Sequence, residues 1–466
     1  MVIFAFLVML VVLVACLGSL WGRPSEGIGI PIVAIGVFAW IYLCQPAYMI
    51  WNGELESYLA DAMVVKGLLV PAAALFFLML GWRRGERRVR KLLERSTSEP
   101  GWNAGRLYRY GLTAACAGTA LHLMWVLRSG GFAQAYGQMH GHGFESEGFT
   151  AYIYMGMFWV QSGVAMMIIS GSRRRLMPAE QVPIAIFAGG LALNGLLQGS
   201  RHDLFAICAI VWVSWSLAKR SRPSIDRAAP VLALACLTAL LMVGYRSVLY
   251  LSSDKPEAPS WTEAVTADIG NRDAAIRSGT SGVEFVVHAV ALETVDQTGK
   301  YDFAFNWLPV YTVHWIPKIW WPNKPPLRLA EVPLAQLGPG ITLADVQDAS
   351  AVQLAKGCAT GIVAEMYMSF GLFSLPFFIW LGWCARRLLF RAEHLRTPFA
   401  MCAYTMAFSL SLNVFGQGFG AILVPLPYSM APFLLYHCAE QINMRRLARA
   451  RAGRHHLPPS LVGSIP

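Results

Sequence analysis

Apolar runs long enough to cross a membrane recur along this chain, and no other feature restricts its fold as strongly. A helix of about 20 apolar residues spans the hydrocarbon core of a bilayer. Such runs lie at 2–21, 27–50, 63–82, 107–127, 151–171, 182–198, 203–218, 229–249, 358–384, 398–415 and 419–438. They predict an all-α polytopic integral membrane protein with about eleven transmembrane helices, within a range of roughly ten to twelve.

Composition agrees with this class. Only 14% of the 466 residues are charged, against roughly 25% in a soluble domain. The nine cysteines lie in or beside apolar runs without paired spacing, which predicts core residues rather than disulfides or a zinc site. The pair His140 and His142 has no third ligand at a suitable spacing, so we predict a glycine-rich loop there and no metal site.

Basic residues define an orientation. They gather in the connections after 63–82, after 151–171, after 203–218 and after 358–384, and in the tail 441–466. Connections rich in lysine and arginine stay in the cytoplasm, so we expect the amino terminus outside and the carboxyl terminus inside. The net charge of +11 is then explained by topology and by contact with anionic membrane lipids, and nucleic acid is not an expected partner.

The chain divides into four parts by this pattern. We expect helices one to eight with short loops at 1–249, a large outer (periplasmic) loop at 250–357, helices nine to eleven at 358–440, and a basic cytoplasmic tail at 441–466. A helix is predicted at about 282–298, where Glu284 and His288 are four residues apart and so share one face. The aromatic and proline-rich stretch "HWIPKIWWPNKP" follows it.

Polar residues inside apolar runs need a reason, because each costs about 2.5–3.5 kcal/mol on insertion scales. The sixth run ends "LNGLLQGSRHD". As one continuous helix, it would place Asn194, Gln198, Arg201 and His202 on a single stripe facing a bundle or cavity. The alternative is a turn that ends the span with ordinary polar capping.

Further polar groups lie near the predicted outer edge of the membrane. Glu365, in "GIVAEMYMSFG", is expected to face a packed interior, where a carboxylate must pair with a cation or be protonated. Asn413 and Gln417 are four residues apart at the same predicted depth. Arg246 lies near the outer interface, where it either contributes to a site or extends its side chain to water.

These residues predict a particular kind of ligand. Arginine side chains match diphosphate oxygens in pairs of hydrogen bonds. Sugar faces stack on tryptophan and tyrosine, and their hydroxyls bond amides and carboxylates. The expected ligand is an anionic lipid head group that carries a carbohydrate.

Four motifs carry a resemblance to a known family. They are "LRSGGFAQAY" (127–136), "GSRHDL" (199–204), "IPKIWWPNKP" (316–325) and "GIVAEMYMSFG" (361–371). With the pattern of spans, which covers nearly the whole chain, they resemble the O-antigen or oligosaccharide-repeat-unit polymerases of the Wzy type.

The resemblance implies a membrane glycosyltransferase architecture of the GT-C-like kind. It implies metal-independent, inverting transfer of a glycan from undecaprenyl diphosphate onto a second lipid-linked repeat unit, without a cofactor. The reaction would occur at the periplasmic face of the bacterial inner membrane and make O-antigen, capsule or exopolysaccharide. A flippase and a chain-length co-polymerase are the implied protein partners.

The chemistry requires cations at the leaving diphosphate and a general base at the acceptor hydroxyl. Glu365, His288, Glu293 and His314 are candidate bases, with Glu365 favoured; a structural ion pair is its alternative. The catalytic candidates are Glu365, His288 and Arg277. The diphosphate-binding candidates are Arg201, Arg246, Arg272, Lys318 and Lys324. The candidate sugar or lipid contacts are Trp315, Trp320, Trp321, Tyr367, Asn413 and Gln417.

Several alternatives stay open. Prolines stiffen the stretch 314–325, so it could hold Lys318 and Lys324 over the membrane, whereas Trp315 and Trp320 could instead be interfacial anchors. An O-antigen ligase would use the same donor. A transporter or flippase of lipid-linked sugars, or a scaffold with a protein-binding outer loop, would be non-enzymatic.

Overall fold

A computed structural model describes the residues 1–53, 55, 59–93, 102–131, 153–197, 200–226, 284–299, 301, 303, 321, 361–419, 422 and 425–455. This part of the chain is helical and contains no strand. The α-helices, in chain order, are α1 (Val2–Leu20), α2 (Ile30–Ala39), α3 (Gln45–Trp51), α5 (Asp61–Leu93), α6 (Ala104–Arg128), α9 (Gly156–Ser170), α10 (Pro178–Leu197), α11 (Arg201–Ala218), α15 (Glu284–Thr298), α19 (Gly361–Phe370), α20 (Leu375–His394), α21 (Pro398–Gln417) and α23 (Pro425–His455).

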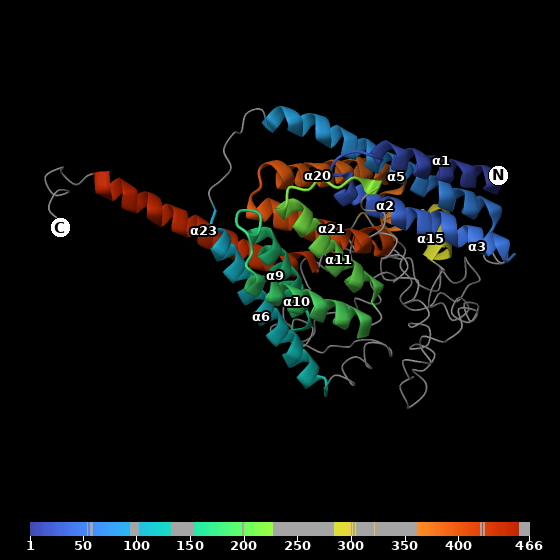
Figure 1. The fold of residues 1–466 in the computed structure, drawn as a ribbon. Helices are drawn as coiled ribbons and strands as arrows, with labels where there is room; N and C mark the ends of the chain where they lie inside the picture. The colour runs from blue at the N-terminus through green and yellow to red at the C-terminus, as the bar shows by residue number, and fades with distance from the viewer. Residues whose placement is uncertain are drawn as a thin grey trace, which may run out of the picture.

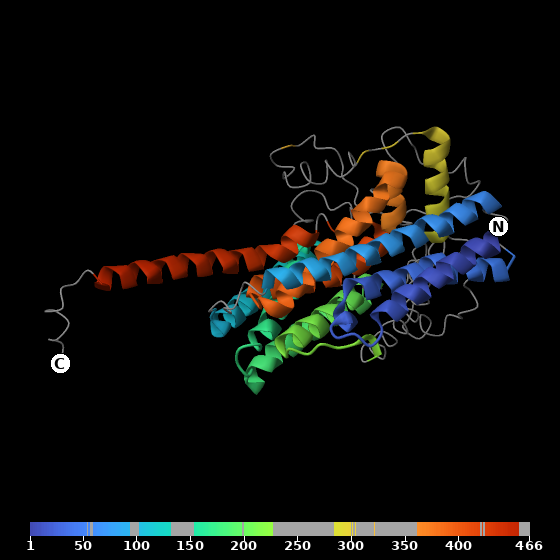
Figure 2. The same ribbon diagram turned by 90° about the horizontal axis from the view of Figure 1, so that it is seen from above.

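The long helices form one bundle (Figure 1). The carboxyl-terminal part of α23 projects past the bundle at one end, and α15 lies near the opposite end, close to the start of α1. Figure 2 shows that α15 runs across the direction of the long helices. α5 contains 33 residues and α23 contains 31. At 1.5 Å per residue each is longer than the roughly 30 Å hydrocarbon core.

Within the described part of the chain, six segments are long and apolar enough to cross a membrane: Val2–Leu20, Ile30–Trp51, Asp61–Glu86, Ala104–Arg128, Gly361–His394 and Pro398–Gln417. α9 and α11 are apolar but shorter. The prediction of a helical, multi-pass membrane protein is therefore confirmed. The expected span 229–249, most of the large loop 250–357 and the residues after 455 lie outside the described part.

Two expected spans are not regular α-helices. The run 27–50 contains a π-helical turn at Trp40–Cys44, between α2 and α3. Its cause is Pro46, which has no N–H to bond the carbonyl of Tyr42 and whose ring would clash with that carbonyl in a regular helix. The N–H of Gln45 instead bonds the carbonyl of Trp40, five residues back.

The expected ninth span at 358–384 is interrupted. α19 ends at Phe370, and a 3₁₀ turn at Gly371–Ser374 separates it from α20. Gly371 has a φ of 56°, a left-handed conformation that glycine adopts without a steric cost. α19 is therefore a short separate helix, and α20 alone is 20 residues long, which is enough to cross the hydrocarbon core.

Glycines allow the closest contacts between helices. A Cβ atom on Gly81 of α5 would lie 1.9 Å from the carbonyl oxygen of Ile379, and one on Gly382 of α20 would lie 2.1 Å from that of Leu78. No side chain fits either space. Small residues commonly let membrane helices approach in this way, because van der Waals packing rather than water exclusion holds them together.

The connections predicted to face the cytoplasm meet at one end of the bundle. Gly27 donates to the carbonyl of Pro223 at 2.8 Å, and Arg83 Nη2 donates to the carbonyl of Ser19 at 2.8 Å. Arg386 Nη1 lies 3.3 Å from Glu26 Oε1. Burial raises the pKa of the Glu26 carboxyl, although Arg386 acts in the opposite direction. The connections that their basic residues mark as cytoplasmic therefore lie together in the structure.

Candidate functional site

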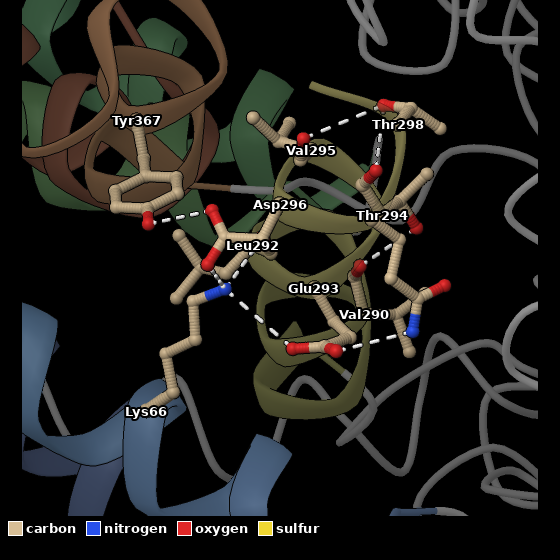
Figure 3. Close-up of polar contacts among 10 residues, drawn as sticks. Lys66, Val290, Leu292, Glu293, Thr294, Val295, Asp296, Thr298 and Tyr367 are labelled. Carbon is tan, nitrogen blue, oxygen red and sulfur yellow. Dashed lines mark hydrogen bonds and ion pairs between the residues drawn. The ribbon is translucent and has the colours of Figure 1, made fainter. Parts of the chain in front are cut away.

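A polar cluster lies where α5, α15 and α19 meet (Figure 3). Lys66 of α5 forms ion pairs with Asp296 and, at 3.5 Å, with Glu293 Oε2, both on α15. Its Nζ also donates to the carbonyl of Leu292 at 2.9 Å. The Tyr367 hydroxyl of α19 donates to Asp296 Oδ1 at 2.8 Å, and Lys66 Nζ lies 5.3 Å from the centre of the Tyr367 ring. Lys66 therefore connects α5, α15 and α19, and it pairs with two carboxylates.

The start of α15 is held by an amide from another helix. Gln45 Nε2 donates to Glu284 Oε2 at 2.6 Å, and Gln45 Oε1 accepts from the N–H of Phe285 at 3.1 Å. The first N–H groups of a helix have no partner inside that helix, so Gln45 caps α15 from a distance. The π-helical turn immediately before Gln45 sets the direction of this side chain.

One turn further along α15, His288 is fully buried. Its Nδ1 is 3.3 Å from the Tyr42 hydroxyl, and the two ring centres are 4.8 Å apart. Glu284 and His288 share the face of α15 that meets Gln45 and Tyr42, as the sequence predicted. Tyr42 belongs to the π-helical turn, so the irregularity caused by Pro46 also positions the partner of His288.

Glu365 on α19 is 2% exposed, which confirms its expected burial. Its Oε2 accepts a hydrogen bond from the backbone N–H of Phe419, just after α21. Gly418 precedes that amide with a φ of 125°, and a Cβ atom there would lie 2.5 Å from Oε2. The carboxylate thus occupies a space that only glycine leaves open.

Tyr42, the partner of His288, lies close to the first residue of α19, the helix that carries Glu365. A Cβ atom on Gly361, the first residue of α19, would lie 3.4 Å from the Tyr42 hydroxyl oxygen. Glu365 follows Gly361 by four residues and so lies one turn along the same face. The Tyr42 hydroxyl that pairs with His288 therefore lies beside the start of α19, and Glu365 lies one turn further along α19. The Lys66 cluster lies further along α15.

Other sequence candidates have different positions. Tyr367, expected to contact sugar or lipid, is 5% exposed and bonds Asp296 as described above. Trp321 is 39% exposed. Asn413 and Gln417 are partly exposed near the end of α21. The following candidates lie outside the described residues: Arg246, Arg272, Arg277, His314, Trp315, Lys318, Trp320 and Lys324.

The predicted stripe at the end of the sixth run is wrong. α10 ends at Leu197, and a new helix, α11, starts at Arg201. Ser200 caps α11, since its Oγ accepts from the N–H of Asp203 at 3.3 Å. Arg201 and His202 therefore belong to a different helix from Asn194, and the alternative of a capped turn is correct. The side chain of Arg201 is outside the described part.

Sequence reasoning missed several of the residues now seen. Lys66 and Gln45 both lie in predicted spans, so the cost of a polar group in lipid would have identified them. The same applies to His122 of α6, which lies in the predicted span 107–127. The His122 ring stacks on Trp125, with ring centres 5.2 Å apart.

The chain matches no family model, no curated protein and no solved structure. A functional conclusion therefore depends on the residues themselves. Around α19 they provide two groups that can accept a proton, Glu365 and His288, and each is held by a hydrogen bond to a neighbouring element. Lys66 provides a cation further along α15, where it forms ion pairs with Glu293 and Asp296.

Proposed function

We propose that the protein is a membrane glycosyltransferase of GT-C-like architecture that polymerises oligosaccharide repeat units linked to undecaprenyl diphosphate. The proposal combines the sequence resemblance with one structural observation. A buried imidazole, His288, and a buried carboxylate, Glu365, lie on two helices that pack together, α15 and α19, toward the end of the bundle opposite the basic connections. By the positive-inside pattern that end faces the periplasm, where a lipid-linked donor and acceptor would meet.

In the proposed reaction the acceptor hydroxyl oxygen attacks the anomeric carbon of the donor from the side opposite the diphosphate. A base removes the hydroxyl proton as the new carbon–oxygen bond forms. The bond to the diphosphate breaks, and the diphosphate leaves with the electron pair, so the configuration inverts. Fixed cations near the leaving group favour the transition state over the ground state because charge develops there.

We assign the base to Glu365, with His288 as the second candidate. The Phe419 amide fixes the Glu365 carboxylate, and orientation of this kind is a large part of general base catalysis. Because both groups are enclosed, the proposal requires the packing around α19 to open when substrate enters. The proposed diphosphate ligands remain Arg201, Arg246, Arg272, Lys318 and Lys324.

The location of the polar groups supports this proposal over transport. A transporter places its binding groups near the middle of the bilayer. In the described part of the chain, the ion pairs lie instead toward the two ends of the bundle. Lys66 pairs with Asp296 at one end. Among the basic connections at the other end, the pairs include Glu26–Arg386, Arg106–Glu440 and Arg174–Glu180.

The test uses Glu365→Gln and His288→Asn in a native host that lacks its own copy of the gene. Gln keeps the size of the carboxylate, and Asn keeps a hydrogen-bonding group near Nδ1, but neither can act as a base. Glu86→Gln is the matched control, because Glu86 is a 46% exposed carboxylate at the other end of the bundle. All variants are compared at equal membrane abundance.

We expect E365Q to leave single repeat units and no ladder of longer chains on a polysaccharide gel, whereas E86Q gives the normal ladder. Long chains that stay attached to undecaprenyl diphosphate would indicate a ligase instead. Normal ladders from both E365Q and H288N would contradict the assignment of the site.

A further inference from the structure

A cavity of about 200 Å³ lies among the basic connections, at the other end of the bundle from His288 and Glu365. It is formed by the end of α11 with the turn that follows, and by the end of α20 with the link to α21. The lining residues that matter here are Arg220, Ser221, Arg222, Glu393, His394 and Arg396.

Positive charge dominates this cavity, since three arginines face a single carboxylate. Arg396 is 7% exposed, and its Nη2 donates to the carbonyl of Ala218 at 3.4 Å. The carbonyl of Arg396 accepts from Trp102 Nε1 at 3.2 Å. The guanidinium is therefore built into the wall of the cavity, whereas the Arg222 side chain is exposed at its rim.

Two of these arginines occupy conformations that usually belong to glycine. Arg220 has a φ of 55° and Arg396 a φ of 47°, and each lies two residues after the end of a helix, α11 or α20. Helices often end in a left-handed residue, but glycine or asparagine is usual there. Here both positions carry long cationic side chains that line the same cavity.

We propose that this cavity binds a phosphate group. Guanidinium groups pair with phosphate oxygens through two parallel hydrogen bonds, and Ser221 adds a hydroxyl. The volume is below the roughly 300–1,000 Å³ of sites for drug-sized ligands, so it suits one phosphate rather than a nucleotide. At a cytoplasmic head-group level, the phosphate comes from an anionic lipid or from a soluble phosphate compound. This inference is independent of the enzymatic proposal.

The experiment measures binding to the purified full-length protein in detergent by native mass spectrometry and by thermal stability. The probes are phosphatidylglycerol, phosphatidylcholine as the neutral lipid, and inorganic phosphate. Arg222→Gln removes one exposed guanidinium from the cavity. Arg84→Gln is its matched control, because Arg84 is exposed at the same end of the bundle and does not line the cavity.

We expect phosphatidylglycerol to bind and stabilise the protein more than phosphatidylcholine does. The Arg222→Gln variant should bind it roughly tenfold more weakly, as for the loss of one charged hydrogen bond, and R84Q should bind normally. Stabilisation by inorganic phosphate that R222Q weakens would assign the site to soluble phosphate. Equal binding of both lipids without an effect of phosphate, or equal binding by R222Q and R84Q, would overturn the proposal.

Discussion

Gly418 is the position where a single methyl group tests the structure around Glu365. Its backbone has φ 125° and ψ 170°, a region that glycine alone adopts readily and that costs other residues about 1–3 kcal/mol. A Cβ atom would also lie 2.5 Å from Glu365 Oε2. The carboxylate would have to move and give up the Phe419 N–H bond, which as a bond to a charged group contributes about 1.5–3 kcal/mol. Gly418→Ala should therefore lower the free energy of unfolding by about 2.5–6 kcal/mol.

Gly416→Ala is the matched control. The nearest atom to a Cβ there is Val37 Cγ1 at 4.0 Å, and alanine favours helices over glycine, so this change should be neutral or slightly stabilising. Unfolding would be measured by titration of the purified protein with sodium dodecyl sulfate, followed by tryptophan fluorescence. The chain contains 16 tryptophans, so the signal is strong.

A double-mutant cycle with Glu365→Ala separates the two causes. Without the carboxylate, G418A should cost only its backbone strain of about 1–3 kcal/mol. The difference between the two backgrounds should then be about 1.5–3 kcal/mol of coupling. If G418A is as stable as G416A, or costs the same with and without Glu365, the described position of the carboxylate is wrong.

Three further predictions concern other contacts. Tyr42→Phe keeps the ring but removes the hydroxyl that contacts His288 Nδ1, so it should lower the free energy of unfolding by about 1–3 kcal/mol. Tyr48→Phe is the control. Equal stability of the Tyr42 and Tyr48 variants would contradict the contact between Tyr42 and His288. Lys66→Met leaves Glu293 and Asp296 without their shared cation. Backbone hydrogen exchange should then become faster across 284–298 but not across α21. Unchanged exchange across 284–298 would exclude a role for Lys66 in holding α15. Hydrogen bonds from Arg174 and from the Met177 amide lower the pKa of the Glu180 carboxyl below its ordinary value, which is about 4.3. The ionised carboxylate therefore stabilises the fold fully at pH values above about 4.3. This stabilisation is lost as the pH falls through the lowered pKa. The acid side of a stability–pH curve should therefore be shallower in Glu180→Gln, and superimposable curves would refute this.

The sequence predicted helices better than it predicted their ends. The runs at 2–21, 63–82, 107–127 and 398–415 correspond to α1, α5, α6 and α21, because a long apolar run in lipid has few alternatives to a helix. Interruptions were harder to foresee. Pro46 distorts a helix, Gly371 follows the end of one, and Ser200 caps the start of another. These are effects of local backbone chemistry, which a count of apolar residues does not register.

The candidate site was predicted in part. Burial of Glu365 and the shared face of Glu284 and His288 follow from local spacing, so sequence was sufficient for both. Their partners lie far away in the chain: Tyr42 is separated from His288 by 246 residues and Lys66 from Leu292 by 226. Nothing in the spacing of a single chain specifies such pairs.

The sequence by itself determined that this chain forms membrane-crossing helices and which connections gather at one end, because hydrophobic length and basic charge act on each segment separately. The tertiary structure decided which residues share a site. Lys66 meets Asp296, and Tyr42 meets His288, because α15 crosses the bundle beside a π-helical turn. Glu365 meets the Phe419 amide where the short helix α19 packs beside the end of α21. Those contacts arise from packing between distant segments, where glycine gaps and backbone irregularities set the geometry.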